Sequence, residues 1–228
     1  MKSFLKSILT RAGLLNMVVA IASRRGALRS TGWLRSAWVG RSVGIDGEPI
    51  PWMTYPLISF LQERIKPDLR ILEFGSGNST LWFAARCAAL ISIEHDEAWV
   101  NSLAEKLPTN SMISVKPTPK GRNYMEIAFG ESDEKNAYVE AIDDIDGTFD
   151  VIVIDGVYRN AAIRKSSPRL SARGVLIVDN TDYPELRESM IWLASEGFRH
   201  IDFVGMSPGV PMLSSTSIFY RPNNCFDI

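Results

Sequence analysis

Two short runs, each with a continuous apolar core, constrain the fold of this 228-residue chain more than any other feature of its sequence. Residues 149–155 read FDVIVID, and residues 174–179 read GVLIVD. Each run is rich in β-branched residues and too short for a buried helix, so each is typical of a strand covered on both faces. Such strands occur in parallel sheets with helices on both sides, and the two runs therefore predict an α/β fold.

Shorter strands and helical segments alternate through the rest of residues 54–221. The pattern predicts five further strands, at residues 70–74, 91–94, 112–116, 198–206 and 216–221. It predicts helices at residues 55–65, 79–90, 97–107, 132–142, 159–170 and 183–196. Strands joined through helices form a Rossmann-like, doubly wound sheet, here of seven mostly parallel strands with helices on both faces. Ligands bind such a sheet beyond the carboxyl ends of its strands.

The charges of the chain are unevenly distributed. Residues 1–41 contain no acidic residue and carry eight basic ones, which are Lys2, Lys6, Arg11, Arg24, Arg25, Arg29, Arg35 and Arg41. The remainder holds 17 basic against 26 acidic residues, so the N-terminal segment is about +8 and the rest about −9. A basic arm on an acidic domain indicates contact with an anionic partner such as a membrane surface. The alternative is a helix that lies on its own acidic domain. No motif for reading DNA or RNA is present, so we expect no nucleic-acid partner.

The first 53 residues are predicted to form a basic, tryptophan-containing helical leader, followed by one domain at residues 54–228. Residues 1–25 have the composition of a basic amphipathic helix that makes peripheral contact with a membrane. Their apolar run at residues 14–22 is too short to span a bilayer, and the alternatives are a packed helix or a secretory signal. Trp33, Trp38 and Trp52 are expected to pack on the domain or to cover a ligand pocket.

Cysteine and histidine are scarce. Two cysteines, Cys87 and Cys225, and two histidines, His95 and His200, exclude a disulfide framework, a cysteine-rich zinc site and a multi-histidine metal site. This composition fits a reducing compartment. We expect a cytoplasmic protein, with the leader holding it peripherally at the inner membrane.

A glycine turn follows the first predicted strand. Glu73 is followed by Gly75, Ser76 and Gly77, and glycines at this place let the backbone approach a ligand closely. A nicotinamide fingerprint has a third glycine at position 80, where this chain has threonine. Glu94 ends the second strand about 20 residues later, where an acidic side chain binds ribose hydroxyls.

These segments, together with residues 149–155 and 174–179, resemble the class I S-adenosylmethionine-dependent methyltransferases over about residues 54–221. The resemblance implies that the turn lies against the methionine part of the cofactor, that Glu94 binds its ribose, and that the last strand is antiparallel. Glu73 would orient the turn or the cofactor's amino group, and His95 or Asp96 would lie near the adenine. The cofactor-binding residues expected on this basis are Glu73, Gly75, Ser76, Gly77, Ser79, Thr80, Glu94, His95 and Asp155.

Acidic side chains also end the fourth and fifth strands. Asp155, Asp179 and Asn180 resemble the set that holds a divalent cation in catechol-type O-methyltransferases, and oxygen ligands of this kind suit Mg²⁺, Mn²⁺ or Ca²⁺. Those enzymes have a basic lysine three residues after the first aspartate, where this chain has Tyr158 and then Arg159. We therefore expect Asp155, Tyr158 and Arg159 to be catalytic, with Arg159 available to hold an anionic group of the substrate. The alternative has Asp155 binding cofactor or a loop, and Asp179 and Asn180 capping a helix.

The resemblance implies O-methylation of a small-molecule or glycan hydroxyl. The leader, residues 117–147 and residues 206–214 would form the acceptor pocket. One alternative is a non-catalytic module that keeps the cofactor fold and docks on a membrane or a partner through its basic leader. Another is a nicotinamide-dependent oxidoreductase, which the threonine at position 80 disfavours.

Overall fold

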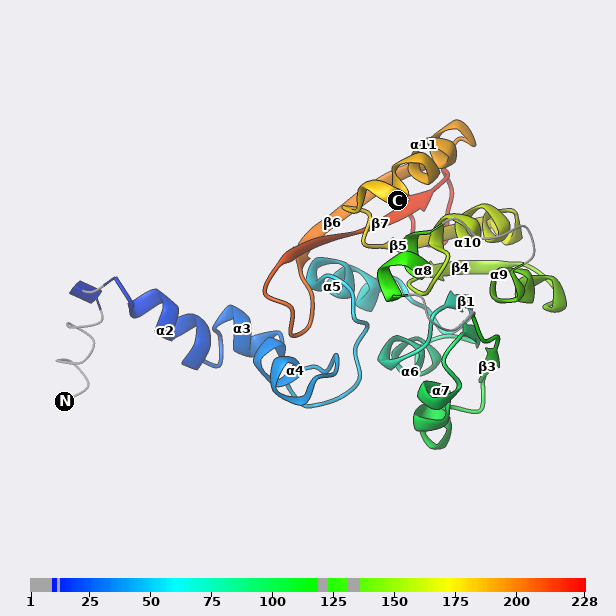
Figure 1. The fold of residues 1–228 in the computed structure, drawn as a ribbon. Coiled ribbons are helices and arrows are strands. Elements are labelled where there is room, and N and C mark those ends of the chain that lie inside the picture. The colour runs from blue at the N-terminus through cyan, green and yellow to red at the C-terminus, as the bar shows by residue number, and fades with distance from the viewer. Residues whose placement is uncertain (1–9, 12, 119–122, 131–135) are drawn as a thin grey trace.

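The computed structural model describes residues 10–11, 13–118, 123–130 and 136–228. Seven strands form one sheet in the order β3-β2-β1-β4-β5-β7-β6 (Figure 1). They are β1 Arg70–Phe74, β2 Ala89–Glu94, β3 Ser111–Val115, β4 Phe149–Ile154, β5 Leu170–Asp179, β6 Arg199–Met206 and β7 Leu213–Tyr220. Strands β1 to β5 pair in parallel, and β7 is antiparallel to both β5 and β6. The predicted Rossmann-like sheet with an antiparallel last strand is confirmed.

Helices cover both faces of this sheet. The α-helices of the described residues are α2 Leu15–Ala22, α3 Ala27–Ser30, α4 Trp33–Val39, α5 Tyr55–Arg64, α6 Asn78–Ala84, α7 Glu97–Leu103, α8 Tyr124–Phe129, α9 Ala137–Glu140, α10 Arg159–Ser166 and α11 Arg187–Ser195. Because alternate strand residues point to opposite faces, Val151 packs in a cluster with Leu57 of α5. Its neighbour Ile152 packs in a second cluster with Ile163 of α10 and Leu193 of α11. These two apolar clusters, one on each face, hold the parallel strands in place, so the carboxyl ends of β1, β2, β4 and β5 lie along the same edge of the sheet.

The structure differs from the predicted elements in the region after β3. Helix α8 lies in a stretch that the sequence pattern predicts to be irregular. Its start is stabilised by a capping box, in which Asn123 accepts a hydrogen bond from the Glu126 backbone and Glu126 accepts one from the Asn123 backbone. The helix predicted at residues 132–142 lies partly outside the described residues, and α9 occupies its second half. Helix α10 ends earlier than predicted because Pro168 follows in a 3₁₀ turn.

The leader is not uniform along its length. Helices α2 and α3 have no buried residue and extend away from the domain (Figure 1). From α4 onward the chain packs on the domain, and Ser36, Val43 and Met53 are buried. Trp33 donates from Nε1 to the Val210 carbonyl at 2.9 Å, as expected for a packed tryptophan. The expectation is wrong for Trp38, which is 90% exposed.

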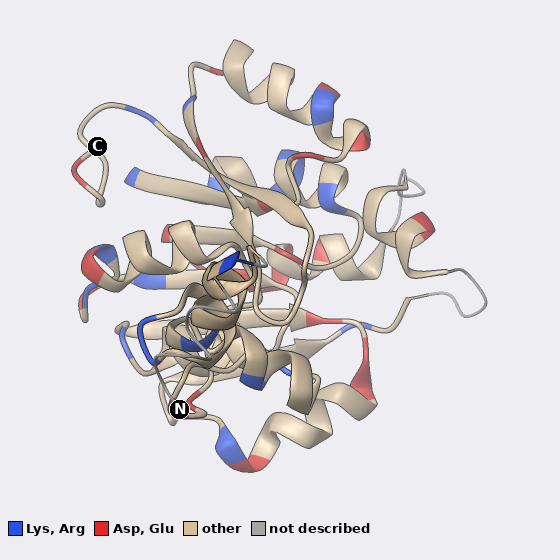
Figure 2. Cartoon of the chain, turned by 90° about the vertical axis from the view of Figure 1, so that its left-hand side faces the viewer, with Lys and Arg blue, Asp and Glu red and all other residues tan. Residues whose placement is uncertain are grey.

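Figure 2 views the molecule from the side of the leader, whose basic positions are drawn in blue. Among the described helices, none combines the length and the apolarity needed to cross a lipid bilayer.

Candidate functional site

The turn after β1 packs directly on the turn after β4. Gly75 has a φ of +95°, and a Cβ there would lie 2.9 Å from the Gly156 backbone nitrogen. A side chain at position 75 would therefore be strained by its backbone and would push the two turns apart. The backbone amide of Gly75 also donates to the Ile93 carbonyl at 2.8 Å, so the ends of β1, β2 and β4 are held together.

Gly77, two residues later, is a glycine for a different reason. Its backbone is extended, and the nearest atom to a Cβ would be in the Trp99 ring at 3.7 Å, an ordinary contact. Packing within the protein therefore does not require glycine here. Gly77 lines a cavity at this edge of the sheet, and a missing side chain at this point leaves room for a ligand against the backbone. This open cradle fits a cofactor bound along the turn.

Glu73 lies behind the turn and is fully buried. Its Oε2 accepts hydrogen bonds from the Thr80 hydroxyl at 2.6 Å and the Ser92 hydroxyl at 3.2 Å, and the Thr80 hydroxyl accepts one from the Gly77 amide at 2.9 Å. Glu73 Oε1 has no hydrogen-bond partner among the described residues. Burial raises the pKa of Glu73 to about 7, although hydrogen bonds from neighbouring hydroxyls oppose the rise. Glu73 and Thr80 hold the turn in place and do not line the cavity.

Glu94 joins the end of β2 to the same turn. Its Oε2 accepts from the Ser76 amide at 2.7 Å and the Ser76 hydroxyl at 3.0 Å, and its Oε1 accepts from the His95 and Asp96 amides. The His95 ring nitrogen Nδ1 lies 2.6 Å from Glu94 Oε1. Burial raises the pKa of Glu94, but the hydrogen bonds from His95, Asp96 and Ser76 outweigh it and lower the pKa. Glu94 is thus a carboxylate at the predicted ribose position, and ribose binding there remains a prediction.

One cavity of about 480 Å³ connects the glycine turn to the ends of β4 and β5. It is lined by Arg41, Ser42, Trp52, Ser76, Gly77, Asn78, Ser79, Trp99, Tyr124, Asp155, Arg159, Asp179, Asn180, Asp182, Tyr183, Ser207, Val210, Met212, Leu213 and Ser214. Of the expected cofactor residues, Ser76, Gly77, Ser79 and Asp155 line this cavity. Glu73, Gly75, Thr80, Glu94 and His95 do not.

Asp155, Asp179 and Asn180 come together at one side of the cavity, around the guanidinium of Arg159. Arg159 is 1% exposed. It donates to Asp155 Oδ1 at 3.1 Å, the Asp179 carbonyl at 2.7 Å and Asn180 Oδ1 at 2.8 Å. It also donates to the Gly156 carbonyl at 2.9 Å. A single buried cation therefore joins the ends of β4 and β5 to the start of α10.

This arrangement does not fit a divalent cation. Arg159 already bonds Oδ1 of the Asp155 carboxylate and the side-chain oxygen of Asn180, two of the oxygens that a metal would need. Asp179 accepts a hydrogen bond from the Thr216 hydroxyl. Within the described residues, no group of three or more His, Cys, Asp or Glu side chains is placed to hold a metal. The three residues of the predicted metal set are adjacent, but a guanidinium occupies their centre.

Comparison with known proteins decides between the cofactor classes. The sequence profile of a family described as "Methyltransferase domain" matches residues 72–181, the segment that runs from the Glu73 turn to the end of β5. The chain contains a class I S-adenosylmethionine-dependent methyltransferase domain. The profile covers the glycine turn, Glu94 and Asp155, so the alternatives of a nicotinamide oxidoreductase and a non-catalytic module are set aside.

Solved structures of other methyltransferases have a similar fold, although their sequences are less than 20% identical to this chain. A precorrin-6y C5,15-methyltransferase from Geobacter metallireducens is 14% identical, with a TM-score of 0.52, over 73% of this chain and 87% of that chain. The O-methyltransferase TomG from Streptomyces achromogenes, solved with S-adenosylmethionine, is 16% identical, with a TM-score of 0.51, over 90% of this chain and 93% of that chain. No curated protein matches the sequence.

Two of the predicted catalytic residues, Tyr158 and Arg159, are engaged in contacts within the protein. Tyr158 is 3% exposed and packs in the core cluster. It does not line the cavity. Tyr158 is the N-cap residue of α10, its backbone is left-handed at φ 51°, and its side chain is buried. Arg159 lines the cavity, but its donors are used by protein oxygens, so the expectation that it holds a substrate anion is not supported. Asp155 keeps a side chain that is 21% exposed.

Sequence reasoning missed Trp99 and Tyr124. Trp99 of α7 donates from Nε1 to the Ser76 carbonyl at 2.7 Å and so covers the glycine turn. The hydroxyl of Tyr124 lies 3.3 Å from Arg159 Nη2. The Asn123 and Glu126 capping pair could have revealed the helix that carries Tyr124, whereas no local pattern distinguishes Trp99 from a surface residue.

Proposed function

We propose that this methyltransferase transfers a methyl group to a hydroxyl oxygen of a small molecule or glycan without the help of a divalent cation. One observation carries the proposal. A single cavity joins the cradle at Gly77 to the carboxyl group of Asp155, while Arg159 takes the place that a metal would need. S-adenosylmethionine, when bound, supplies a methyl group that is already activated, so the chain's own residues mainly position the acceptor and exclude water.

Asp155 is the group best placed to take the acceptor's proton. Burial, and next the neighbouring Asp179, raise the pKa of Asp155 well above its ordinary value, and Arg159 opposes them. A carboxylate with a raised pKa has a greater affinity for a proton than an exposed aspartate has. The acceptor oxygen would gain the methyl carbon as the methyl–sulfur bond breaks and its electron pair stays on the sulfur of S-adenosylhomocysteine, and the Asp155 carboxylate would accept the acceptor's proton.

Arg159 performs the positioning that a metal performs elsewhere. Its fixed positive charge lies 3.1 Å from Asp155 Oδ1 and 3.3 Å from the Tyr124 hydroxyl. It therefore orients Asp155 and holds Tyr124 at the cavity wall. Because the guanidinium is always charged and its donors are all bonded, it supplies a positive charge at this place without a bound metal ion.

The test measures methyl transfer from S-adenosylmethionine labelled in its methyl group to a panel of phenols and sugar alcohols, with EDTA or with Mg²⁺. We expect transfer to a hydroxyl at equal rates in both conditions. Asp155→Asn should lower kcat by roughly 10²- to 10⁴-fold while leaving the Kd for the cofactor within about threefold. Activity that EDTA abolishes and Mg²⁺ restores would contradict the proposal, as would transfer to amines alone.

A further inference from the structure

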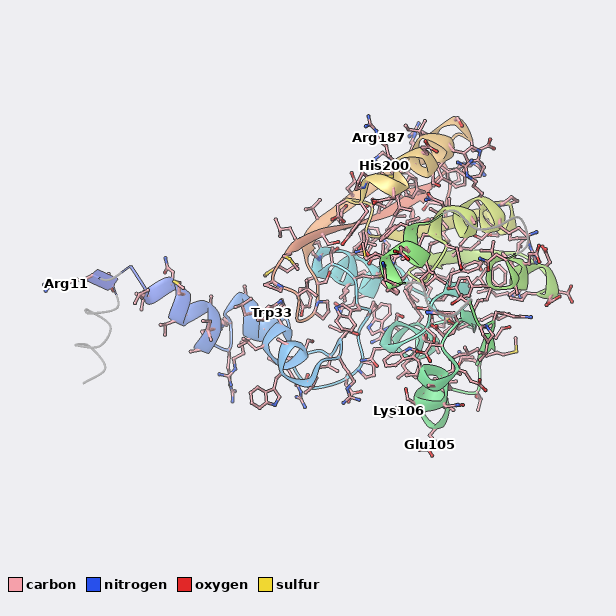
Figure 3. All side chains as sticks on the ribbon, viewed as in Figure 1. Arg11, Trp33, Glu105, Lys106, Arg187 and His200 are labelled. Carbon is pink, nitrogen blue, oxygen red and sulfur yellow. The ribbon has the colours of Figure 1, made fainter. Side chains whose placement is uncertain are left out.

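Helix α2 presents an exposed apolar surface that the described part of the chain does not bury. The large apolar side chains in and beside it are between 39% and 60% exposed, and they are Leu14, Met17, Val18, Val19 and Ile21. No residue of α2 is buried, and Figure 3 shows its side chains standing clear of the domain. A run of exposed apolar residues of this kind marks a contact with another molecule or with lipid.

Positive charge surrounds this apolar helix. Arg11 precedes it, and Arg24 and Arg25 follow it, with Arg29 and Arg35 beyond. No acidic residue occurs before Asp46. An apolar helix flanked by arginines complements an anionic lipid surface, because apolar side chains enter the interface while guanidiniums meet the phosphates. The acidic domain, at about −9, would be repelled by the same surface, so the leader is the part suited to contact it.

A second cavity lies where α2 meets α3 and α4. Its lining includes three basic residues, Arg24, Arg29 and Arg35, one acidic residue, Asp46, and the apolar side chains of Ile21, Leu34 and Ile45, so its charge is positive on balance. Arg29 donates from Nη1 to the Ala22 carbonyl at 2.9 Å, and Arg35 donates from Nη1 to the Ile45 carbonyl at 3.0 Å, so backbone bonds hold two of the guanidiniums in position. Three guanidiniums beside apolar walls match a phosphate that carries an acyl chain.

We propose that the leader docks the enzyme on an anionic phospholipid bilayer, with α2 lying in the interface and a lipid phosphate held by Arg24, Arg29 and Arg35. The partner proposed for α2 and the arginine cavity is therefore a phospholipid surface. The docked leader neither spans the bilayer nor requires a second protein.

The leader also connects this docking surface to the catalytic cavity. Beyond the arginine cavity, Arg41, Ser42 and Trp52 form part of the catalytic cavity's wall. Asn78 fixes this wall by donating to the Ser42 carbonyl at 2.6 Å. Met212 also lines this cavity and is 66% exposed, in the loop that packs on α4 through the bond from Trp33 to Val210. Resting on the proposed function, the acceptor is then a hydroxyl compound with an apolar part that is reached at the lipid surface.

The test is co-sedimentation of the full chain with vesicles of phosphatidylcholine alone or mixed with phosphatidylglycerol. We expect at least tenfold tighter binding to the anionic vesicles, weakened by high salt. Val19→Asp on α2 and Arg24→Glu in the arginine cavity should each lower this binding at least tenfold. Matched changes on the far side of the domain, Ile191→Asp and Arg187→Glu, should leave it unchanged; Figure 3 marks Arg187 on α11. Inorganic phosphate at millimolar concentration should not displace the protein.

Equal binding to both vesicle types would overturn the docking proposal, as would leader variants that bind like the wild type. Self-association of the wild type that Val19→Asp abolishes, without lipid binding, would assign α2 to a second copy and would also overturn it. Calorimetric titration of each variant with S-adenosylmethionine distinguishes failure of the docking proposal from failure of the proposed function. Unchanged cofactor binding with lost vesicle binding keeps both proposals, whereas absent cofactor binding in a folded sample contradicts the proposed function alone.

Discussion

At the scale of single residues, two glycines in one turn serve different purposes. Gly75 has a left-handed backbone and lies against the Gly156 backbone, so its place is set by packing within the protein. Gly77 is extended and faces the cavity, so its place is set by the ligand. Both are visible in the sequence, but only the structure separates a glycine needed for folding from one needed for binding.

We expect Gly75→Ala and Gly77→Ala to fail in different ways. Gly75→Ala should lower the free energy of unfolding by about 1 to 3 kcal/mol because its backbone is strained at that residue. Gly77→Ala should unfold like the wild type and bind S-adenosylmethionine at least tenfold more weakly. Gly44→Ala, whose Cβ would meet only ordinary contacts outside the cavity, is the control. Urea unfolding and calorimetric titration measure the two effects, and equal loss of stability in both variants would contradict the distinction.

Glu73 predicts a pH dependence of stability. Its pKa is raised from 4.5 to about 7 by burial, so the folded state binds the proton more tightly than the unfolded state. The resulting stabilisation is fully present below about pH 4.5 and is lost as the pH rises through about 7. Relative to Glu73→Gln, the wild type should lose about 2 to 3 kcal/mol of unfolding free energy between pH 5 and pH 8.

Denaturant unfolding of both proteins at several pH values measures this difference. If the wild type and the Glu73→Gln variant lose or keep stability in parallel across that range, Glu73 titrates near its ordinary pKa and burial does not raise its pKa as described.

At the scale of elements, Arg159 joins four of them. Its guanidinium donates to groups at the ends of β4 and β5, contacts Tyr124 of α8 and belongs to α10. The sequence predicts β4, β5 and the adjacent acidic side chains, because short apolar runs that end in aspartate form a local pattern. It cannot predict that an arginine fills the space between them, since that depends on how four separate segments pack.

Arg159→Met should destabilise the protein by about 3 to 5 kcal/mol, because it leaves buried carboxyl groups without their cation. Arg159→Lys should recover only a small part of this loss, since an ammonium cannot reproduce the planar fork. Arg164→Met is the matched control on the exposed side of the same helix and should cost less than about 1 kcal/mol. A thermal shift for Arg159→Met no larger than that of the control would contradict the role assigned to Arg159.

At the scale of the whole molecule, the chain combines an acidic methyltransferase domain with a basic leader. The first part of this leader extends away from the domain, and the second part packs on it. The sequence predicts the charge separation and a leader of residues 1–53, because composition changes visibly along the chain. The leader's tryptophans predict packing on the domain, but the sequence does not show which contacts make it. That packing depends on contacts such as Trp33 with Val210 and Asn78 with Ser42, which join residues far apart in the sequence.

Two truncations test this division of the leader. Removing residues 1–31 should leave the melting temperature and the cofactor affinity unchanged, because α2 and α3 have no buried residue. Removing residues 1–53 should lower the melting temperature by several degrees, because it uncovers the apolar cluster beneath Met53 and deletes part of the cavity wall. Equal melting temperatures for the two truncated proteins would show that the whole leader is dispensable for folding.

The most direct test of the account is calorimetric titration of the purified chain with S-adenosylmethionine, S-adenosylhomocysteine and NAD. We expect saturable binding of the first two at one site per chain and no binding of NAD. Gly77→Ala should bind S-adenosylmethionine at least tenfold more weakly. A folded sample that binds none of the three, or that binds NAD in preference, would contradict the assignment of the cavity to a methyltransferase cofactor.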